Sequence, residues 1–153
     1  MTPSDDHMFL VEESTPARTL TMEEISAGMA VTQRFVFTEQ AMIDYARFAN
    51  DLAPIHWDPL FAREYGYEAP IIQGLAVVSR FSRLIGMYLP GSKAVIQSTD
   101  FKFRRPTMVG DELTYKVKVA KIVPMVRLVK VRLEASKGED LHVEGWCQCR
   151  IGE

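Results

Sequence analysis

The residues best suited to chemistry lie in one short segment, residues 50–58, which reads NDLAPIHWD. Asp51 and His56 stand five residues apart across Pro54. This spacing lets a carboxylate at a helix end and a loop imidazole converge on one small molecule or one water. Imidazole gives and takes protons at neutral pH, and a neighbouring carboxylate orients it. The pair therefore suggests a general acid/base site.

Two other interpretations of this segment stay open. Asp and Pro are frequent turn formers, so the segment can be purely structural, with His56 capping or filling a turn. Asp51, His56 and Asp58 could also bind a metal ion, although their spacing matches no diagnostic ligand pattern. The remaining histidines are interpreted as surface residues, His7 in an N-terminal arm and His142 on the polar face of a strand.

Gly74 opens the most apolar stretch of the chain, which runs to Leu89 and is stopped by Pro90 and Gly91. A helix starting there points its first N–H outward with the positive end of its dipole, which suits an oxygen that gains negative charge. Without a side chain, Gly74 also lets a substrate approach the backbone. The structural alternative is that this glycine only eases the turn into the helix.

Periodicity predicts the elements that position these residues. Alternating residues over 31–37 predict a strand, and Thr38 is a suitable N-cap for a helix that ends near Asn50. The apolar face of that helix is expected to contain Met42, Tyr45, Phe48, Ala49 and Leu52. Four more strands are predicted near 95–104, 113–119, 129–135 and 141–150, and their short connections favour antiparallel pairing.

A sheet wrapped around the apolar helix would bury that helix, which makes the fold class α+β. Residues 1–25 show no sustained periodicity and are expected to form an arm, so a single domain is predicted over 26–153. Arg80 and Arg83 interrupt the apolar stretch, so no membrane span is expected. The acidic N-terminus has no apolar segment of the kind found in secretion signals.

The composition is that of an ordinary globular protein. Of 153 residues, 47% are hydrophobic and 25% are charged, which excludes a disordered chain or a disulfide scaffold. Lys and Arg total 18 against 20 Asp and Glu, so the chain lacks the basic charge of a nucleic-acid binder. The only cysteines, Cys147 and Cys149, alternate on a predicted strand as small buried residues and favour a reducing, cytoplasmic location.

Taken together, Asp51, His56, Gly74 and Ser82 resemble the site pattern of the MaoC-like (R)-specific enoyl-CoA hydratases. The resemblance covers about residues 35–113 and includes the spacings from His56 to Gly74 and from Gly74 to Ser82. It implies the hot-dog fold, in which an antiparallel sheet of about five strands wraps around a long central helix. It also implies a homodimer.

The resemblance also implies a reaction, the reversible addition of water to a trans-2-enoyl thioester of coenzyme A or an acyl carrier. The product is the (R)-3-hydroxyacyl thioester, and no metal or other cofactor is required. Asp51 and His56 correspond to the family's catalytic pair, and Gly74 to its backbone donor for the thioester carbonyl. Ser82 corresponds to a serine that supports the catalytic pair.

Three positions depart from the family's pattern: Asn50 replaces Gly, Ala53 replaces Asn, and Gln73 replaces His. These changes keep two alternatives open, a hot-dog thioesterase and a non-catalytic acyl-thioester-binding partner subunit. Arg104 and Arg105 could contact the phosphates of coenzyme A, because guanidinium groups match phosphate geometry. A solvated strand end is the favoured interpretation of these two arginines.

Overall fold

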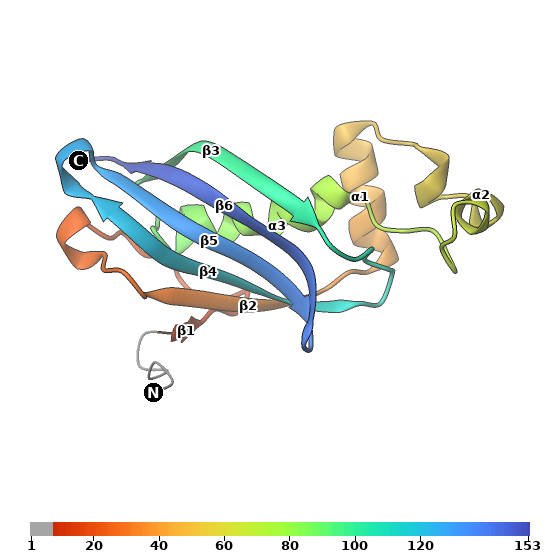
Figure 1. Ribbon diagram of the computed structural model, residues 1–153, viewed down its shortest axis with the longest axis horizontal. Coiled ribbons are helices and arrows are strands. Elements are labelled where there is room, and N and C mark those ends of the chain that lie inside the picture. The colour runs from red at the N-terminus through yellow and green to blue at the C-terminus, as the bar shows by residue number, and fades with distance from the viewer. Residues whose placement is uncertain (1–7) are drawn as a thin grey trace.

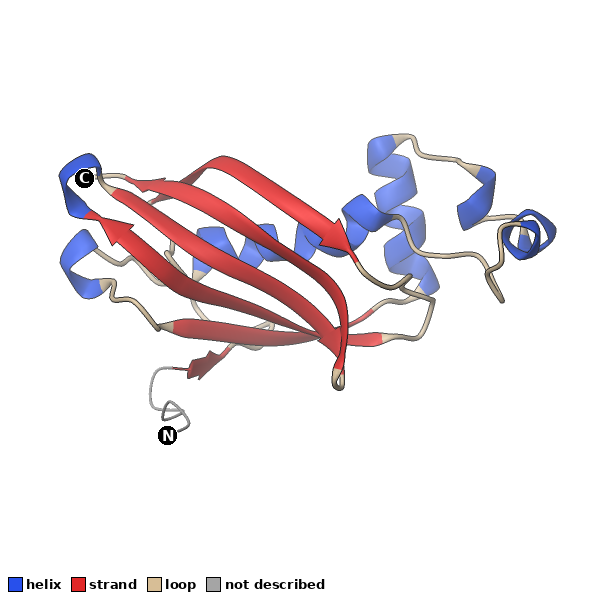
Figure 2. Cartoon of the chain, viewed as in Figure 1, coloured by secondary structure: helices blue, strands red, loops and turns tan. Residues whose placement is uncertain are grey.

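The computed structural model describes residues 8–153, so His7 and the start of the predicted arm lie outside the described residues. Figures 1 and 2 show the arrangement of the elements. The helices are α1 (Glu39–Ala49), α2 (Pro59–Glu64) and α3 (Gly74–Met87), with short 3₁₀ turns at Met22–Glu24, Pro54–His56 and Pro124–Val126. The strands are β1 (Met8–Leu10), β2 (Ala30–Val36), β3 (Ala94–Phe103), β4 (Glu112–Val123), β5 (Leu128–Lys137) and β6 (Asp140–Ile151).

The strands form one sheet in the order β1-β2-β4-β5-β6-β3. Neighbouring strands pair antiparallel, except that β1 runs parallel to β2. The long helix α3 lies along one face of this curved sheet (Figure 1). This arrangement confirms the α+β class and the hot-dog fold. The sheet has six strands rather than about five, because residues 8–10 of the predicted arm form β1.

The core lies between α3 and the sheet. Side chains from both layers are buried there, including Val77, Phe81, Leu84, Leu113, Tyr115, Val117, Val131 and Leu133. Cys147 and Cys149 are buried as predicted, at 1% and 0% exposure. Among residues 8–153, no helix is long and apolar enough to cross a bilayer.

Helix α1 begins and ends where the sequence predicts. The Thr38 hydroxyl accepts the N–H of Ala41 at 3.1 Å, and Asn50 ends the helix in the left-handed conformation with φ of 53°. The predicted buried face is wrong in part, because Phe48 and Leu52 are 89% and 70% exposed and Ala49 is exposed as well. Helix α1 stands beyond the end of the sheet rather than across its face (Figure 1), so only a narrow side of it meets the core.

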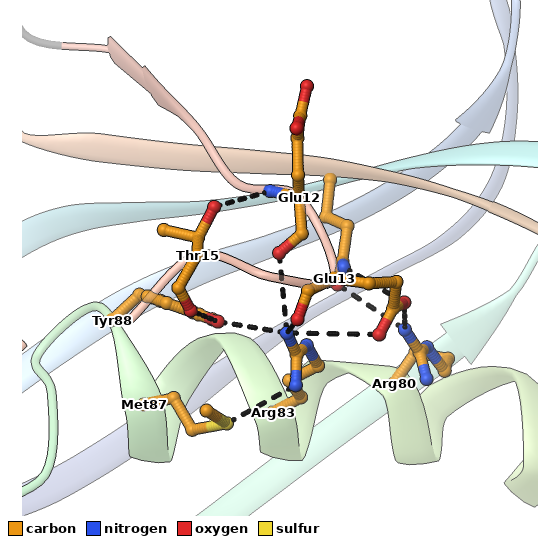
Figure 3. A network of polar contacts seen from close by, with 8 residues as sticks. Glu12, Glu13, Thr15, Arg80, Arg83, Met87 and Tyr88 are labelled. Carbon is orange, nitrogen blue, oxygen red and sulfur yellow. Dashed lines mark hydrogen bonds and ion pairs between the residues drawn. The ribbon is translucent and has the colours of Figure 1, made fainter. Parts of the chain in front are cut away.

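The first described segment, residues 8–20, crosses α3 and is called here the N-terminal strap. Arg83 of α3 donates to the carbonyl of Glu13 at 3.0 Å and to the hydroxyl of Tyr88 at 2.9 Å. Tyr88 in turn donates to the carbonyl of Thr15 at 2.7 Å. Figure 3 shows the network, which also includes Glu12, Arg80 and Met87. The two arginines that interrupt the apolar stretch therefore hold the strap on α3.

Candidate functional site

The loop after α1 fixes the orientation of Asp51. Asn50 turns the chain out of the helix, and Oδ1 of Asp51 accepts the N–H of Ala53 at 3.2 Å. A 3₁₀ turn over Pro54–His56 follows and brings His56 back toward the carboxylate. The Oδ2 atom of Asp51 is left to face the imidazole.

Asp51 and His56 lie together, as predicted. Their Oδ2 and Nε2 atoms are 3.9 Å apart, and the side chains are 35% and 11% exposed. The other imidazole nitrogen, Nδ1, lies 2.7 Å from the carbonyl oxygen of Ile71. Because a carbonyl only accepts, Nδ1 carries the proton and Nε2 of the neutral ring is an acceptor. Two acceptors at this separation can share one water, which donates a hydrogen bond of about 2.8 Å to each.

Asp58 does not join this pair. Its Oδ1 atom accepts the N–H of Leu60 at 2.8 Å and that of Phe61 at 3.3 Å, so it caps the N-terminus of α2. Within residues 8–153, no three His, Cys, Asp or Glu side chains are grouped so that they could hold a metal ion. A metal site of Asp51, His56 and Asp58 would require the Asp58 side chain to give up its hydrogen bonds to the N-terminus of α2.

The segment before α3 connects the Asp51–His56 pair to Gly74. The Ile71 carbonyl accepts from His56, and the N–H of Ile72 donates to the carbonyl of Thr107 at 2.8 Å. Gly74 is the first residue of α3, and no residue of the described chain accepts its N–H. The first amides of a helix have no partner inside it and carry the positive end of its dipole. Gly74 N–H is therefore a candidate donor to a carbonyl oxygen.

Gln73, which departs from the family's pattern, lies directly before this donor. The side chain is 1% exposed, and neither its amide oxygen nor its amide nitrogen has a hydrogen-bond partner in the described part of the chain. Leaving a polar group buried and unpaired costs about 1–3 kcal/mol. The sequence identifies Gln73 only as a departure from the family's pattern, and that pattern does not indicate its burial.

Ser82 is separate from the other predicted site residues. It follows Gly74 by eight residues of α3, which is about 12 Å along the axis at 1.5 Å per residue. Its side chain is exposed, and no hydrogen bond joins it to Asp51 or His56 in the described chain. The chain thus links Asp51, His56 and Gly74, and leaves Ser82 on its outer surface.

A cavity of about 240 Å³, called here the Gly74 cavity, opens beside the start of α3. Its lining residues are Tyr67, Ile71, Ile72, Gly74, Val77, Phe103, Arg104, Arg105, Pro106, Thr107 and Val143. Ile72, Val77, Thr107 and Val143 are buried and form its deep wall, whereas residues 103–106 are exposed and form its mouth. Asp51 and His56 are not among the lining residues.

Both arginines at the mouth of the cavity are paired with carboxylates. Nε of Arg104 donates to Glu144 at 2.7 Å, and Arg105 lies 3.1 Å from Asp140. Hydrogen bonds from Arg104 and Arg132 lower the pKa of Glu144. These pairs favour the interpretation of Arg104 and Arg105 as a strand end over a preformed phosphate site.

The prediction that His142 lies on the surface is wrong, since it is only 5% exposed. The pairing of β5 with β6 shifts register between Ala135 and Ser136, which leaves His142 without a partner on β5. Nδ1 of the ring lies 3.2 Å from the hydroxyl of Thr107, a residue of the deep cavity wall. Burial lowers the pKa of His142. Strand alternation places this residue on the wrong face because the bulge interrupts the alternation.

Comparison with known proteins supports the resemblance seen in the sequence. The chain is 35% identical over 96 residues to the (R)-specific enoyl-CoA hydratase of Aeromonas caviae, covering 63% of this chain and 70% of that protein. It is 28% identical over 128 residues to the 3-hydroxybutyryl-CoA dehydratase of Methylorubrum extorquens, covering 84% and 82%. The solved (R)-hydratase from A. caviae involved in PHA biosynthesis matches with a TM-score of 0.80 at 27% identity, covering 85% of this chain and 99% of that one.

The family model described as the MaoC like domain matches residues 16–140, which is most of the chain. The protein therefore belongs to the MaoC-like family.

Proposed function

We propose that this protein is an enoyl-thioester hydratase, or in reverse a 3-hydroxyacyl dehydratase. It adds water to a trans-2-enoyl thioester of coenzyme A or an acyl carrier and yields the (R)-3-hydroxyacyl thioester. The observation that carries the proposal is the arrangement of His56, whose Nε2 faces Asp51 at 3.9 Å while Nδ1 is held by Ile71. Ile71 precedes Gly74 by three residues, so the same loop holds the base and leads to the carbonyl donor.

In the proposed mechanism, Gly74 N–H binds the thioester carbonyl, so C3 becomes electrophilic and negative charge gathers on the oxygen. Asp51 and His56 hold one water near C3 and remove its proton as the C3–O bond forms and the C2–C3 π bond breaks. The same pair then delivers a proton to C2, so one water is added. Acid/base assistance contributes about 10²–10⁴-fold and a carbonyl donor about 10²–10³-fold. We assign Ser82 the role of supporting the pair.

The proposal involves no metal or redox cofactor, because the thioester itself activates the alkene. Coenzyme A takes part only as a portion of the substrate.

The test is an assay with crotonyl-CoA that follows the enoyl absorbance and the free thiol in parallel. The proposal expects the absorbance to fall without thiol release, and the product to be oxidised only by an (R)-specific 3-hydroxyacyl-CoA dehydrogenase. Thiol release would identify a thioesterase instead. Binding of the thioester without either change would identify a non-catalytic partner subunit.

We also propose a homodimer built on β3, which is the last strand of the sheet and has only β6 as a neighbour among the described strands. An open strand edge invites pairing with another strand. A second subunit beside β3 and α3 would cover the exposed side chain of Ser82. The functional unit we propose is residues 26–153, with residues 1–25 as an arm.

A cytoplasmic location is proposed from the two cysteines. Cys147 and Cys149 are free and buried, with their sulfur atoms 3.7 Å apart. A reducing compartment keeps such thiols unpaired. Separation of cell extracts into cytoplasmic and membrane fractions, followed by detection of the protein, tests this location.

A further inference from the structure

We infer that Asp111 is a positioning residue for His56: its carboxylate fixes the turn that supports the Ile71 carbonyl, and this carbonyl holds the imidazole. The inference rests on the proposed function, since it concerns the orientation of the proposed base. It also goes beyond that function, because the proposed mechanism gives Asp111 no role.

The segment that carries His56 lies away from the sheet and needs an anchor on it. Helix α2 and the loops on either side of it extend beyond the end of the sheet (Figure 1). Two hydrogen bonds join the segment to Ile71. Nδ1 of His56 donates to the Ile71 carbonyl at 2.7 Å, and the N–H of Ile71 donates to the carbonyl of Ile55 at 3.3 Å. The imidazole therefore follows a shift of the Ile71 backbone.

The anchor is the turn over residues 107–111, which lies directly before β4. Met108 forms an antiparallel bridge with Ile71, and the carbonyl of Thr107 accepts the N–H of Ile72 at 2.8 Å. Two neighbouring residues of the turn thus hold two neighbouring residues of the segment before α3. The position of the turn therefore determines where the Ile71 carbonyl meets the imidazole.

Asp111 ties this turn to the sheet with both oxygens of its carboxylate. Oδ2 accepts the N–H of Met108 at 2.9 Å, and Oδ1 accepts a hydrogen bond from Nζ of Lys137, the last residue of β5, at 2.5 Å. Asp111 is only 8% exposed. Hydrogen bonds to an ionised group are roughly twice as strong as those between neutral groups. One buried side chain thus connects the end of β5 to the residue that faces Ile71.

The surroundings of Asp111 keep its carboxylate charged. Burial raises the pKa of Asp111, but hydrogen bonds from Lys137 and from the N–H of Met108 lower it, and the pKa lies below its ordinary value. The positive charge of Lys137 and the neighbouring His142 lower it further. An ionised carboxylate only accepts hydrogen bonds, so both oxygens remain available to their donors.

The experiment compares Asp111→Ala with Asp111→Asn in the crotonyl-CoA assay. We expect Asp111→Ala to lower kcat by about 10–100-fold, since a displacement of about 1 Å at a catalytic group can cost about 10²-fold. KM should change little, because Asp111 does not line the Gly74 cavity. Asp111→Asn should recover most of kcat, because its amide oxygen can still accept the N–H of Met108. Lys137, whose side chain is 56% exposed, can turn toward solvent in this variant.

Val129→Ala is the matched control for a general loss of stability. Val129 is fully buried near the start of β5, at the opposite end of that strand from Lys137. This variant should lower the melting temperature and keep kcat. If Asp111→Ala behaves in the same way, Asp111 only stabilises the turn and the inference is wrong. It is also wrong if Asp111→Asn fails to recover kcat.

Nitrogen-15 NMR of the imidazoles separates this inference from the proposed function, because it needs no substrate. The chain has three histidines, and His56→Ala identifies the signals of His56. We expect a proton fixed on Nδ1 in the unsubstituted protein and in Asp111→Asn, and a mixture of tautomers in Asp111→Ala. This result would support the positioning role even if no thioester were hydrated. An unchanged His56 spectrum in Asp111→Ala would reject the role, whatever the activity.

Discussion

The two nitrogens of His56 have different partners, and this difference determines what the residue can do. Nδ1 donates to the carbonyl of Ile71 at 2.7 Å, whereas Nε2 faces the Asp51 carboxylate at 3.9 Å. The first contact fixes the tautomer and the ring plane, as a second hydrogen bond does for many functional histidines. The second sets two acceptors at a separation that one bridging water can span. In the proposed mechanism, Asp51 and His56 therefore act together on a single proton.

Replacing either member of the pair should abolish most turnover. We expect Asp51→Asn and His56→Ala each to lower kcat by about 10²–10⁴-fold, the usual range for a lost acid/base group. Both residues lie in a partly exposed loop, so melting temperatures should change little. Steady-state kinetics with crotonyl-CoA and thermal melts measure the two effects. Asp44→Asn, on the exposed side of α1, is the control, and near-normal activity of either variant would refute the assignment.

His142 should make the protein less stable as the pH falls. Burial has the largest effect on the pKa of His142 and lowers it, whereas Asp111 has the next largest effect and raises it. Lys137 and Arg105 lower the pKa further, and Asp140 raises it. Between the folded pKa and the unfolded value of about 6.5, the unfolded state binds more protons, so stability drops as the pH falls through this window.

The variant His142→Gln cannot take up this proton. We expect the difference in melting temperature between about pH 7.5 and about pH 5.5 to be smaller in His142→Gln than in the unsubstituted protein. The pH dependence is compared rather than the absolute stability, because the substitution also changes packing. An unchanged difference would mean that His142 titrates equally in both states.

At the scale of elements, Gly74 at the start of α3 packs against Phe103 and, in the proposed mechanism, donates its N–H to the substrate carbonyl. A methyl group at position 74 would meet the Phe103 ring at 3.0 Å, and the half-exposed ring has room to yield. Alanine also favours helix by about 1 kcal/mol over glycine. We therefore expect Gly74→Ala to keep its melting temperature, while kcat falls by as much as about 10²–10³-fold because the carbonyl is displaced from its donor.

Gly86→Ala is the matched control for this experiment, since it lies in the same helix and its added Cβ would meet nothing within 4 Å. It should keep full activity. If Gly74→Ala loses stability in step with activity, Gly74 is a structural turn residue. If neither property changes, the carbonyl is held elsewhere.

We expect the hydrogen bonds of Arg83 to stabilise the N-terminal strap more than the ion pairs of Glu13 do. Arg83 bonds backbone carbonyls and the Tyr88 hydroxyl, and its side chain is 21% exposed, whereas the Glu13 carboxylate is 70% exposed. We expect Arg83→Met to lower the free energy of unfolding by about 1–3 kcal/mol, because the hydroxyl of the buried Tyr88 and two carbonyls of the strap lose their donor. Glu13→Gln should cost less than about 1 kcal/mol, as exposed ion pairs do. Urea denaturation measures both, and equal losses would contradict this ranking.

Some elements are predictable from the sequence because local chemistry determines them. Thr38 and Asn50 mark the ends of α1, and alternation identifies the strands of the second half. Strand β1 is only three residues long and pairs with a distant partner, so periodicity gives no signal for it. Alternation assigns His142 to the wrong face, because the bulge in β6 arises from its pairing with β5 and leaves no local signal in the sequence. The Asp51–His56 contact was predictable from spacing, whereas the burial of Gln73 depends on packing that no local pattern encodes.

At the scale of the whole molecule, the two edges of the sheet differ in how open they are. The edge strand β1 has three residues, and edge strands this short are a common protection against unwanted pairing. The opposite edge strand, β3, has ten residues, with Val95 and Ile96 exposed at 65% and 43%. Pairing between two copies is therefore expected at β3.

A second copy at β3 would be related by a two-fold axis, because homodimers are commonly built from one patch that pairs with itself. We expect light scattering at micromolar protein to give the mass of a dimer. Antiparallel pairing places the middle of β3 opposite its own counterpart, so Ser98→Lys would set like charges against each other and weaken the dimer. Met125→Lys, at a 94% exposed position between β4 and β5, should leave the dimer intact.

A test of Ser82 follows from the same variant. If Ser82 acts only when a partner subunit covers it, the Ser98→Lys dimer should dissociate and lose specific activity over the same range of protein concentrations. A monomer that is fully active at every concentration would show that the Asp51–His56 pair needs neither the partner nor the cover it gives to Ser82.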